Sequence, residues 1–126
     1  MRKIFLLLTL SLSLIVFKVC PAFAQSDFPT ATFGENMQLT LSAEAPLSPF
    51  YTVDISSIAF KDAAGADRFF RSLTDNLVRA TVNYDAKEAT IQLMVAYAEG
   101  WDVSQWNNYF ATVQARYQGA FEKFNN

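Results

Sequence analysis

Few residues of this chain could do chemistry, because the sequence contains no histidine and only one cysteine, Cys20. Histidine is the commonest general base and metal ligand at neutral pH. A serine nucleophile needs a neighbouring base, and Ser56 and Ser57 could find only a lysine partner. The lysines that could serve are Lys61, Lys87 and Lys123. We therefore expect a protein that is not an enzyme.

Paired carboxylates are the next candidates, since two of them can share the acid and base roles of glycoside hydrolysis. Asp54, Asp62 and Asp67 form the closest group along the chain. Asp62 precedes a helical pattern and fits an N-cap, and the other two fit solvated surface charges. Glycine-rich phosphate loops and calcium-loop spacings are missing from the sequence. We expect no bound cofactor and no metal site.

Aromatic side chains are the remaining candidates for a functional site. Tyr97, Trp101 and Tyr109 surround the start of the last predicted helix, where they could stack on a sugar or a peptide. Phe121 and Phe124 lie near the end of that helix, where they could contact a partner. These five residues are the candidate ligand or partner contacts.

Two functions remain open. The first is a non-catalytic module that binds another protein or a second copy of itself. The alternative is a small-ligand carrier, with an aromatic pocket between the sheet and the last helix around Tyr51, Tyr84, Tyr97 and Trp106. The formal charge of −2 makes nucleic acid an improbable partner in either case.

The N-terminus has the pattern of a secretory signal peptide. Arg2 and Lys3 are followed by an apolar run over 4–17, and small residues stand at Ala22 and Ala24. An apolar run of this length is too short to span a bilayer. We expect cleavage after Ala24 and a periplasmic or extracellular protein. Lipid attachment at Cys20 is a lesser alternative, because the residues before it are not small.

Cleavage would change the molecule that acts after export. It removes 24 of the 126 residues, three basic side chains and Cys20, so 102 residues with a net charge of −5 remain. Such a chain cannot form a disulfide, which is a common stabiliser of small exported domains. Its stability must come from its core, and we expect no membrane-spanning segment in it.

Hydrophobic periodicity predicts the elements of a single domain over 36–126, after a flexible lead-in over 25–35. Alternation predicts strands, three-and-four spacing predicts helices, and Asp62 and Asp102 fit their N-caps. The 85–88 segment is a tight turn between two alternating runs, which is typical of a hairpin. The predicted strands cover 36–42, 51–55, 78–84 and 89–97, and the predicted helices cover 62–76 and 103–124.

The last helix carries an apolar stripe at unbroken three-and-four spacing. Its members are Val103, Trp106, Phe110, Val113, Tyr117, Ala120 and Phe124. A single helix of this length would extend about 33 Å. It would outrun a small sheet, so its end could meet a partner.

The element order β-β-α-β-β-α predicts an α+β fold. We expect a two-layer open-faced sandwich, with a four-stranded antiparallel sheet and both helices on one face. The 36–42 strand could pair antiparallel beside the 51–55 strand, which would give a circularly permuted ferredoxin-like fold. A different position for the first hairpin, and so a different topology, stays open.

The segment from Tyr51 to Phe121 resembles the heavy-metal-associated domains, a ferredoxin-like family of metal carriers. The resemblance covers about 70 residues and consists of the hydrophobic spacing, the turn at Asp85 and the helix that follows. That family binds soft metal through two cysteines in the loop after its first strand. The matching loop here, 56–62, contains no cysteine, histidine or methionine. The resemblance therefore implies a fold and no metal ligand.

Overall fold

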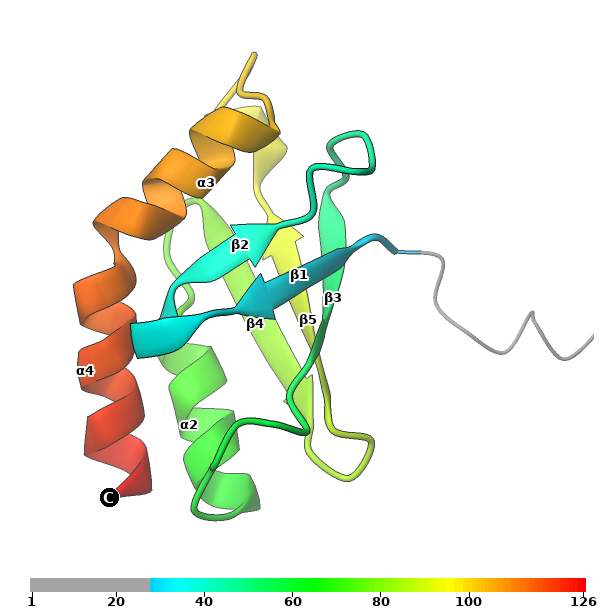
Figure 1. The fold of residues 1–126 in the computed structure, drawn as a ribbon. Coiled ribbons are helices and arrows are strands. Elements are labelled where there is room, and N and C mark those ends of the chain that lie inside the picture. The colour runs from blue at the N-terminus through cyan, green and yellow to red at the C-terminus, as the bar shows by residue number, and fades with distance from the viewer. Residues whose placement is uncertain (1–27) are drawn as a thin grey trace, which may run out of the picture.

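Alternating apolar and polar residues build a five-stranded sheet in residues 28–126, the part of the chain that the computed structural model describes (Figure 1). The strands are β1 (Thr30–Phe33), β2 (Leu39–Leu41), β3 (Phe50–Asp54), β4 (Val78–Asn83) and β5 (Glu88–Leu93). The helices are α2 (Ala63–Ser72), α3 (Val103–Thr112) and α4 (Gln114–Asn125), with short 3-10 turns η2 (Glu35–Met37) and η3 (Val95–Tyr97). The predicted signal peptide and Cys20 lie outside the described residues.

The sheet is mixed, with the strand order β2-β1-β3-β5-β4. β1 pairs antiparallel with β2 and parallel with β3, and the remaining neighbours are antiparallel. The α+β class predicted from the sequence is confirmed. The predictions of four strands and of an all-antiparallel sheet are wrong.

The strand that corrects the predicted topology is β1, which falls inside the segment 25–35 that we expected to be a flexible lead-in. It lies between β2 and β3. The 36–42 strand therefore does not pair with the 51–55 strand, the pairing that would have given a circularly permuted ferredoxin-like fold. β2 is also shorter than predicted, because Asn36 and Met37 adopt φ values of 58° and 61°. These left-handed conformations turn the chain from β1 back into β2.

The β4–β5 hairpin forms as predicted, with the turn at 84–87. β5 ends at Leu93 and not at Tyr97, because its neighbour β3 begins at Phe50. The Leu93 N–H donates to the Pro49 carbonyl, just before β3 begins. Residues after Leu93 therefore lie past the start of β3 and have no strand residue of β3 opposite them. The chain then turns into η3, which carries Tyr97.

The predicted single helix over 103–124 is two helices. α3 begins at a capping box, in which Asp102 accepts from the Gln105 N–H and Gln105 accepts from the Asp102 N–H. It ends at Val113, whose φ of −98° and ψ of 3° leave the helical region. α3 then packs on β2, while α4 packs on α2 and η2 (Figure 1).

The α2–α4 contact depends on a glycine. Asp62 caps α2 by accepting from the Gly65 N–H at 2.7 Å, as predicted from the sequence. A Cβ on Gly65 would lie only 2.8 Å from the carbonyl oxygen of Phe124. Asn125 reaches across the same contact and accepts from the Lys61 N–H at 3.0 Å. The absence of a side chain at Gly65 lets the end of α4 approach α2.

The helices cover one face of the sheet and leave the other open, as predicted (Figure 1). The covered face and the helices share a core in which Tyr51, Phe69, Trp106, Phe110 and Tyr117 are fully buried. The open face presents mainly polar side chains, with exposed threonines on β1, β2 and β4 and half-buried ones on β3 and β5. Within residues 28–126, every helix falls short of the length and apolar character that a bilayer crossing requires.

Hydrogen bonds from flanking segments engage one backbone position at each edge of the sheet. At the β2 edge, the Asn107 amide of α3 accepts from the Leu41 N–H at 2.8 Å and donates to the Leu41 carbonyl at 3.3 Å. At the β4 edge, Asp75 accepts from the Val78 N–H at 2.9 Å, and the Asp75 N–H donates to the Val78 carbonyl.

Candidate functional site

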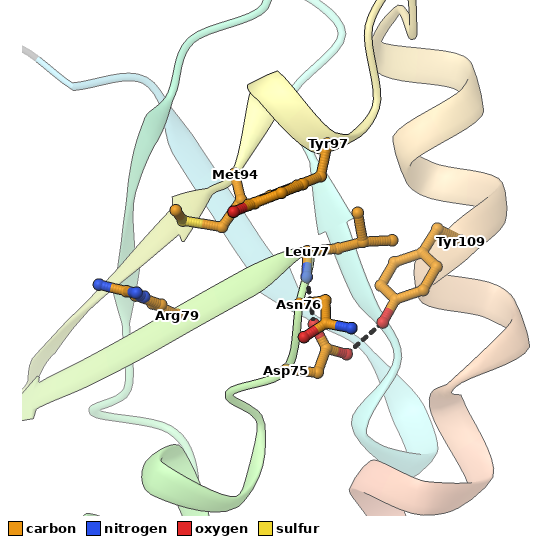
Figure 2. Close-up of a pocket in the computed structure, with 7 residues that line it drawn as sticks. All are labelled: Asp75, Asn76, Leu77, Arg79, Met94, Tyr97 and Tyr109. Carbon is orange, nitrogen blue, oxygen red and sulfur yellow. Dashed lines mark hydrogen bonds between the residues drawn. The ribbon is translucent and has the colours of Figure 1, made fainter.

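The candidate site is a hollow of about 760 Å³ beside the start of β4, which we call the Tyr97 pocket (Figure 2). Its lining combines aromatic, aliphatic and polar side chains. The lining residues are Asp75, Asn76, Leu77, Arg79, Met94, Tyr97 and Tyr109. The volume suits a small organic ligand.

Four elements meet at the Tyr97 pocket. The loop after α2 supplies Asp75, β4 supplies Arg79, the turn after β5 supplies Tyr97, and α3 supplies Tyr109. The Met94 N–H donates to the Leu77 carbonyl at 2.8 Å, which ties the end of β5 to the start of β4. The pocket therefore has walls fixed by the sheet and by α3.

Asp75 is the most heavily hydrogen-bonded side chain of the pocket. Its Oδ1 accepts from the Leu77 and Val78 N–H groups at 2.8 and 2.9 Å. Its Oδ2 accepts from the Tyr109 hydroxyl and from Arg116 Nη2, the latter at 2.9 Å. An ionised carboxylate has about four acceptor positions, so the acceptor capacity of Asp75 is used by the protein itself.

These contacts also set the protonation states. Partial burial would raise the pKa of Asp75, but the hydrogen bonds from Tyr109 and from the Leu77 and Val78 N–H groups prevail, and the pKa is lowered. Desolvation and the hydrogen bond to Asp75 raise the pKa of Tyr109 to about 12. At neutral pH Asp75 is therefore a carboxylate and Tyr109 a neutral donor. Neither is suited to accept or release a proton near pH 7.

Three side chains of the pocket remain available to a ligand. Arg79 is exposed and forms no ion pair with any residue of 28–126, and Figure 2 shows its guanidinium directed away from Asp75. The exposed Asn76 side chain has no hydrogen bond to another described residue. Tyr97 is 72% exposed, an unusual position for a large aromatic side chain.

A smaller hollow of about 330 Å³, the Trp101 groove, shares Tyr109 with the Tyr97 pocket. Trp101, Gln105, Asn108, Tyr109 and Thr112 line it. The Trp101 ring stands edge-on to buried Trp106, with the ring centroids 5.1 Å apart. Trp101 is therefore half-buried and presents only part of its ring to solvent.

The structure brings together three of the five predicted contact residues. Tyr97 and Tyr109 line the Tyr97 pocket, and Trp101 shares the adjoining groove with Tyr109. Phe121 and Phe124 lie elsewhere, on α4. The Phe121 ring packs 5.5 Å from that of Phe60, and Phe124 lies at the contact with α2.

The predicted pocket between the sheet and the last helix does not form as expected. Tyr51 and Trp106 are fully buried in the core, and Tyr84 lies near the hairpin turn beneath the Lys87 ammonium. Of that predicted group, Tyr97 lines the Tyr97 pocket. The residues that the sequence analysis missed are Asp75 and Arg79. Each follows the pattern of an ordinary surface charge, so no signal in the sequence singles them out.

Within residues 28–126, no three side chains of histidine, cysteine, aspartate or glutamate gather where they could hold a metal ion. Asp54 and Asp62 serve locally, as acceptors for the Ser56 and Gly65 N–H groups. Hydrogen bonds from Ser56 lower the pKa of Asp54.

No known protein guides the assignment. No family model matches the chain, and neither a curated protein nor a solved structure matches it. The resemblance to heavy-metal-associated domains therefore stays a hypothesis, and the function must be argued from the geometry.

Proposed function

We propose that the protein is a non-catalytic binding protein whose Tyr97 pocket takes a small organic anion with a planar ring. One observation carries this proposal: Arg79 brings a positive charge without an ion-pair partner in residues 28–126 to a pocket that also holds the exposed ring of Tyr97. A guanidinium pairs well with a carboxylate. Aromatic rings favour offset or edge-on contact with one another.

The lining residues of the Tyr97 pocket would contact different parts of the ligand. The ligand ring would lie against Tyr97 and the apolar side chains of Leu77 and Met94. Its carboxylate would accept from Arg79, and Asn76 would add an amide donor or acceptor. Asp75 would take no direct part, because its acceptor positions are filled. It would instead hold Tyr109 and the start of β4 in place.

The test uses a charged and a neutral ligand of the same shape, 2-naphthoate and 2-naphthamide, in isothermal titration calorimetry. We expect the carboxylate to bind more tightly than the amide. Arg79→Gln should weaken naphthoate binding about tenfold, the loss of one charged hydrogen-bonding partner. Arg68→Gln, at an exposed position of α2, is the matched control and should leave binding unchanged. Equal binding of the two ligands, or equal effects of the two variants, would contradict the proposal.

We also propose that the protein acts outside the cytoplasm after cleavage at Ala24. The support is the sequence pattern of residues 1–24. Mass spectrometry of the exported protein should find an N-terminus at Gln25. An intact Met1 or a lipid on Cys20 would refute export as a soluble protein.

Self-association remains the second candidate, since the open sheet face is available to another chain. Light scattering over a range of protein concentrations would detect it. A single mass at all concentrations would contradict self-association and leave only the small-ligand proposal.

A further inference from the structure

The open face of the sheet carries a row of hydroxyl side chains that crosses four strands and extends to the residue after β2. The pairings Thr30 with Thr52, Thr52 with Thr90, and Thr90 with Thr81 align four threonines across β1, β3, β5 and β4. On the other side of β1, the Ser42 N–H donates to the Thr30 carbonyl, so Ser42, the residue after β2, lies opposite Thr30 and ends the row. Within the row the Thr52 Oγ1 is buried, whereas Thr30 and Thr81 are exposed. Neighbouring strands lie about 4.8 Å apart, so the row is a closely spaced series of hydroxyl groups.

The β2 end of this row opens into a hollow of about 450 Å³, which we call the hydroxyl hollow. Four of its lining residues carry hydroxyl groups, and two more carry a carboxylate and an amide. The lining residues are Thr30, Thr32, Thr40, Leu41, Ser42, Ala43, Glu44 and Asn107. The Asn107 amide is already engaged by the Leu41 backbone. The Ser42 hydroxyl accepts from the Glu44 N–H at 3.3 Å and keeps its own proton to donate. The threonine hydroxyl groups, the Ser42 donor and the Glu44 carboxylate are therefore the groups that can meet a ligand.

These groups suit a neutral ligand rich in hydroxyl groups. A hydroxyl side chain both donates and accepts, as the hydroxyl groups of a sugar do. The exposed Glu44 carboxylate can accept from two adjacent hydroxyl groups of one ligand. The lining contains no lysine or arginine, and its only charge is negative. An anionic ligand would therefore be repelled.

An aromatic surface adjoins the hollow on the same face of the sheet. Phe28 and Phe50 precede Thr30 and Thr52 by two residues, so their side chains fall on the same side of the sheet as those threonines. Their rings are stacked, with centroids 5.1 Å apart and planes inclined by 18°. Phe28 is 43% exposed, and the pair offers an apolar platform next to a polar hollow.

From this juxtaposition we propose that the open face binds a neutral oligosaccharide, with sugar hydroxyl groups in the hydroxyl hollow and a C–H face of the sugar on the Phe28–Phe50 pair. The hydroxyl hollow shares no lining residue with the Tyr97 pocket. Cross-strand threonine pairs also stabilise sheets, so a test must separate binding from folding.

The experiment records ¹H–¹⁵N spectra of the purified protein with four neutral probes: cellotetraose, xylotetraose, maltotetraose and N,N′,N″,N‴-tetraacetylchitotetraose. At about 10 mM, a concentration that detects millimolar affinity, at least one should shift the amide signals of Thr30, Thr40, Ser42 and Glu44. No shift with any of the four, or shifts confined to another face, would overturn the proposal.

Variants then separate the hydroxyl hollow from the rest of the row. Thr30→Val should weaken binding about fivefold, as expected for one lost hydrogen bond. Thr81→Val removes a hydroxyl group from the far end of the same row and should change affinity less than about twofold. Glu44 lies in an exposed loop, so Glu44→Gln removes the carboxylate charge without changing the stability of the sheet. Equal effects of Thr30→Val and Thr81→Val, or no effect of Glu44→Gln, would refute the assignment.

Discussion

The molecule contains two aromatic clusters of similar packing and different character. The phenylalanine cluster joins α2, α4 and β1 through Phe33, Phe60, Phe69, Phe70 and Phe121, with ring centroids 5.0 to 6.0 Å apart. The tryptophan–tyrosine cluster lies at α3 and consists of Trp101, Trp106, Tyr109 and Phe110, with centroids 5.1 to 6.4 Å apart. The distances between ring centroids alone do not distinguish a packed core from a candidate ligand site.

The two clusters differ in the polar atoms at their surfaces. None of the five phenylalanines lines the Tyr97 pocket or the Trp101 groove, whereas Tyr109 lines both. The Tyr109 hydroxyl reaches Asp75, and Asp75 in turn holds Arg116 of α4. In this molecule, hollows lie beside the cluster whose edge carries anchored polar groups, and neither the Tyr97 pocket nor the Trp101 groove touches the phenylalanine cluster.

The largest effect is expected at Phe69, which is fully buried in the phenylalanine cluster. Phe69→Ala should cost about 3–5 kcal/mol of unfolding free energy, because it removes a large apolar group and leaves a cavity. Chemical denaturation followed by circular dichroism measures the change. A loss below about 1 kcal/mol would mean that the phenylalanine cluster is not a tightly packed core.

The second prediction concerns Asp75, which supports the site. Asp75→Asn should cost about 1–2 kcal/mol at pH 7, because the charged hydrogen bonds to Tyr109 and Arg116 weaken. Asp67→Asn is the control: its ion pair with Arg71 is exposed, and we expect less than about 0.5 kcal/mol.

The contribution of Asp75 should depend on pH. Since the pKa of Asp75 is lowered on folding, the carboxylate stabilises the protein above its ordinary pKa near 3.9. That contribution is lost as the pH falls through the folded-state value. The stability difference between wild type and Asp75→Asn should therefore shrink below about pH 4. A difference that stays constant to pH 2 would contradict the assigned role.

Two glycines give a matched test at the α2–α4 contact. Gly65→Ala places a Cβ against the Phe124 carbonyl and should destabilise the protein by about 1–2 kcal/mol, after the gain in helix propensity. Gly119→Ala meets no atom within 4 Å and should stabilise α4 by about 0.5–1 kcal/mol. Thermal unfolding should move in opposite directions for the two variants. A shift of both in the same direction would show that α4 does not approach α2 closely at Gly65.

Local patterns predicted much of the fold. Asp62 and Asp102 cap their helices as expected, and the β4–β5 hairpin and the polar open face follow from alternation. Each of these depends on residues close together in the sequence. Local propensity and periodicity therefore carry enough information to place them.

Features that depend on distant contacts could not be predicted in this way. β1 has four residues and lies between Pro29 and Gly34, so its alternation is too short to recognise. The break at Val113 leaves the three-and-four spacing intact while it changes the direction of the chain. Asp75 pairs with Tyr109 and Arg116, which are 34 and 41 residues away. The spacing of residues along the sequence does not predict such long-range pairs.

The smallest effect on stability is expected at Tyr97. Its exposed ring makes Tyr97→Ala nearly neutral, with a change below about 0.5 kcal/mol. The same variant should weaken naphthoate binding about tenfold, because it removes the stacking surface. A large loss of stability would place Tyr97 among the core residues instead.

The central claim, that the tryptophan–tyrosine end and not the phenylalanine end receives the ligand, has a direct test. A ¹H–¹⁵N titration with 2-naphthoate should shift the backbone signals of Asn76, Leu77, Arg79 and Tyr97, and leave those of Phe69 and Phe121 in place. Shifts concentrated at Phe69 and Phe121, or no shifts at all, would contradict the account.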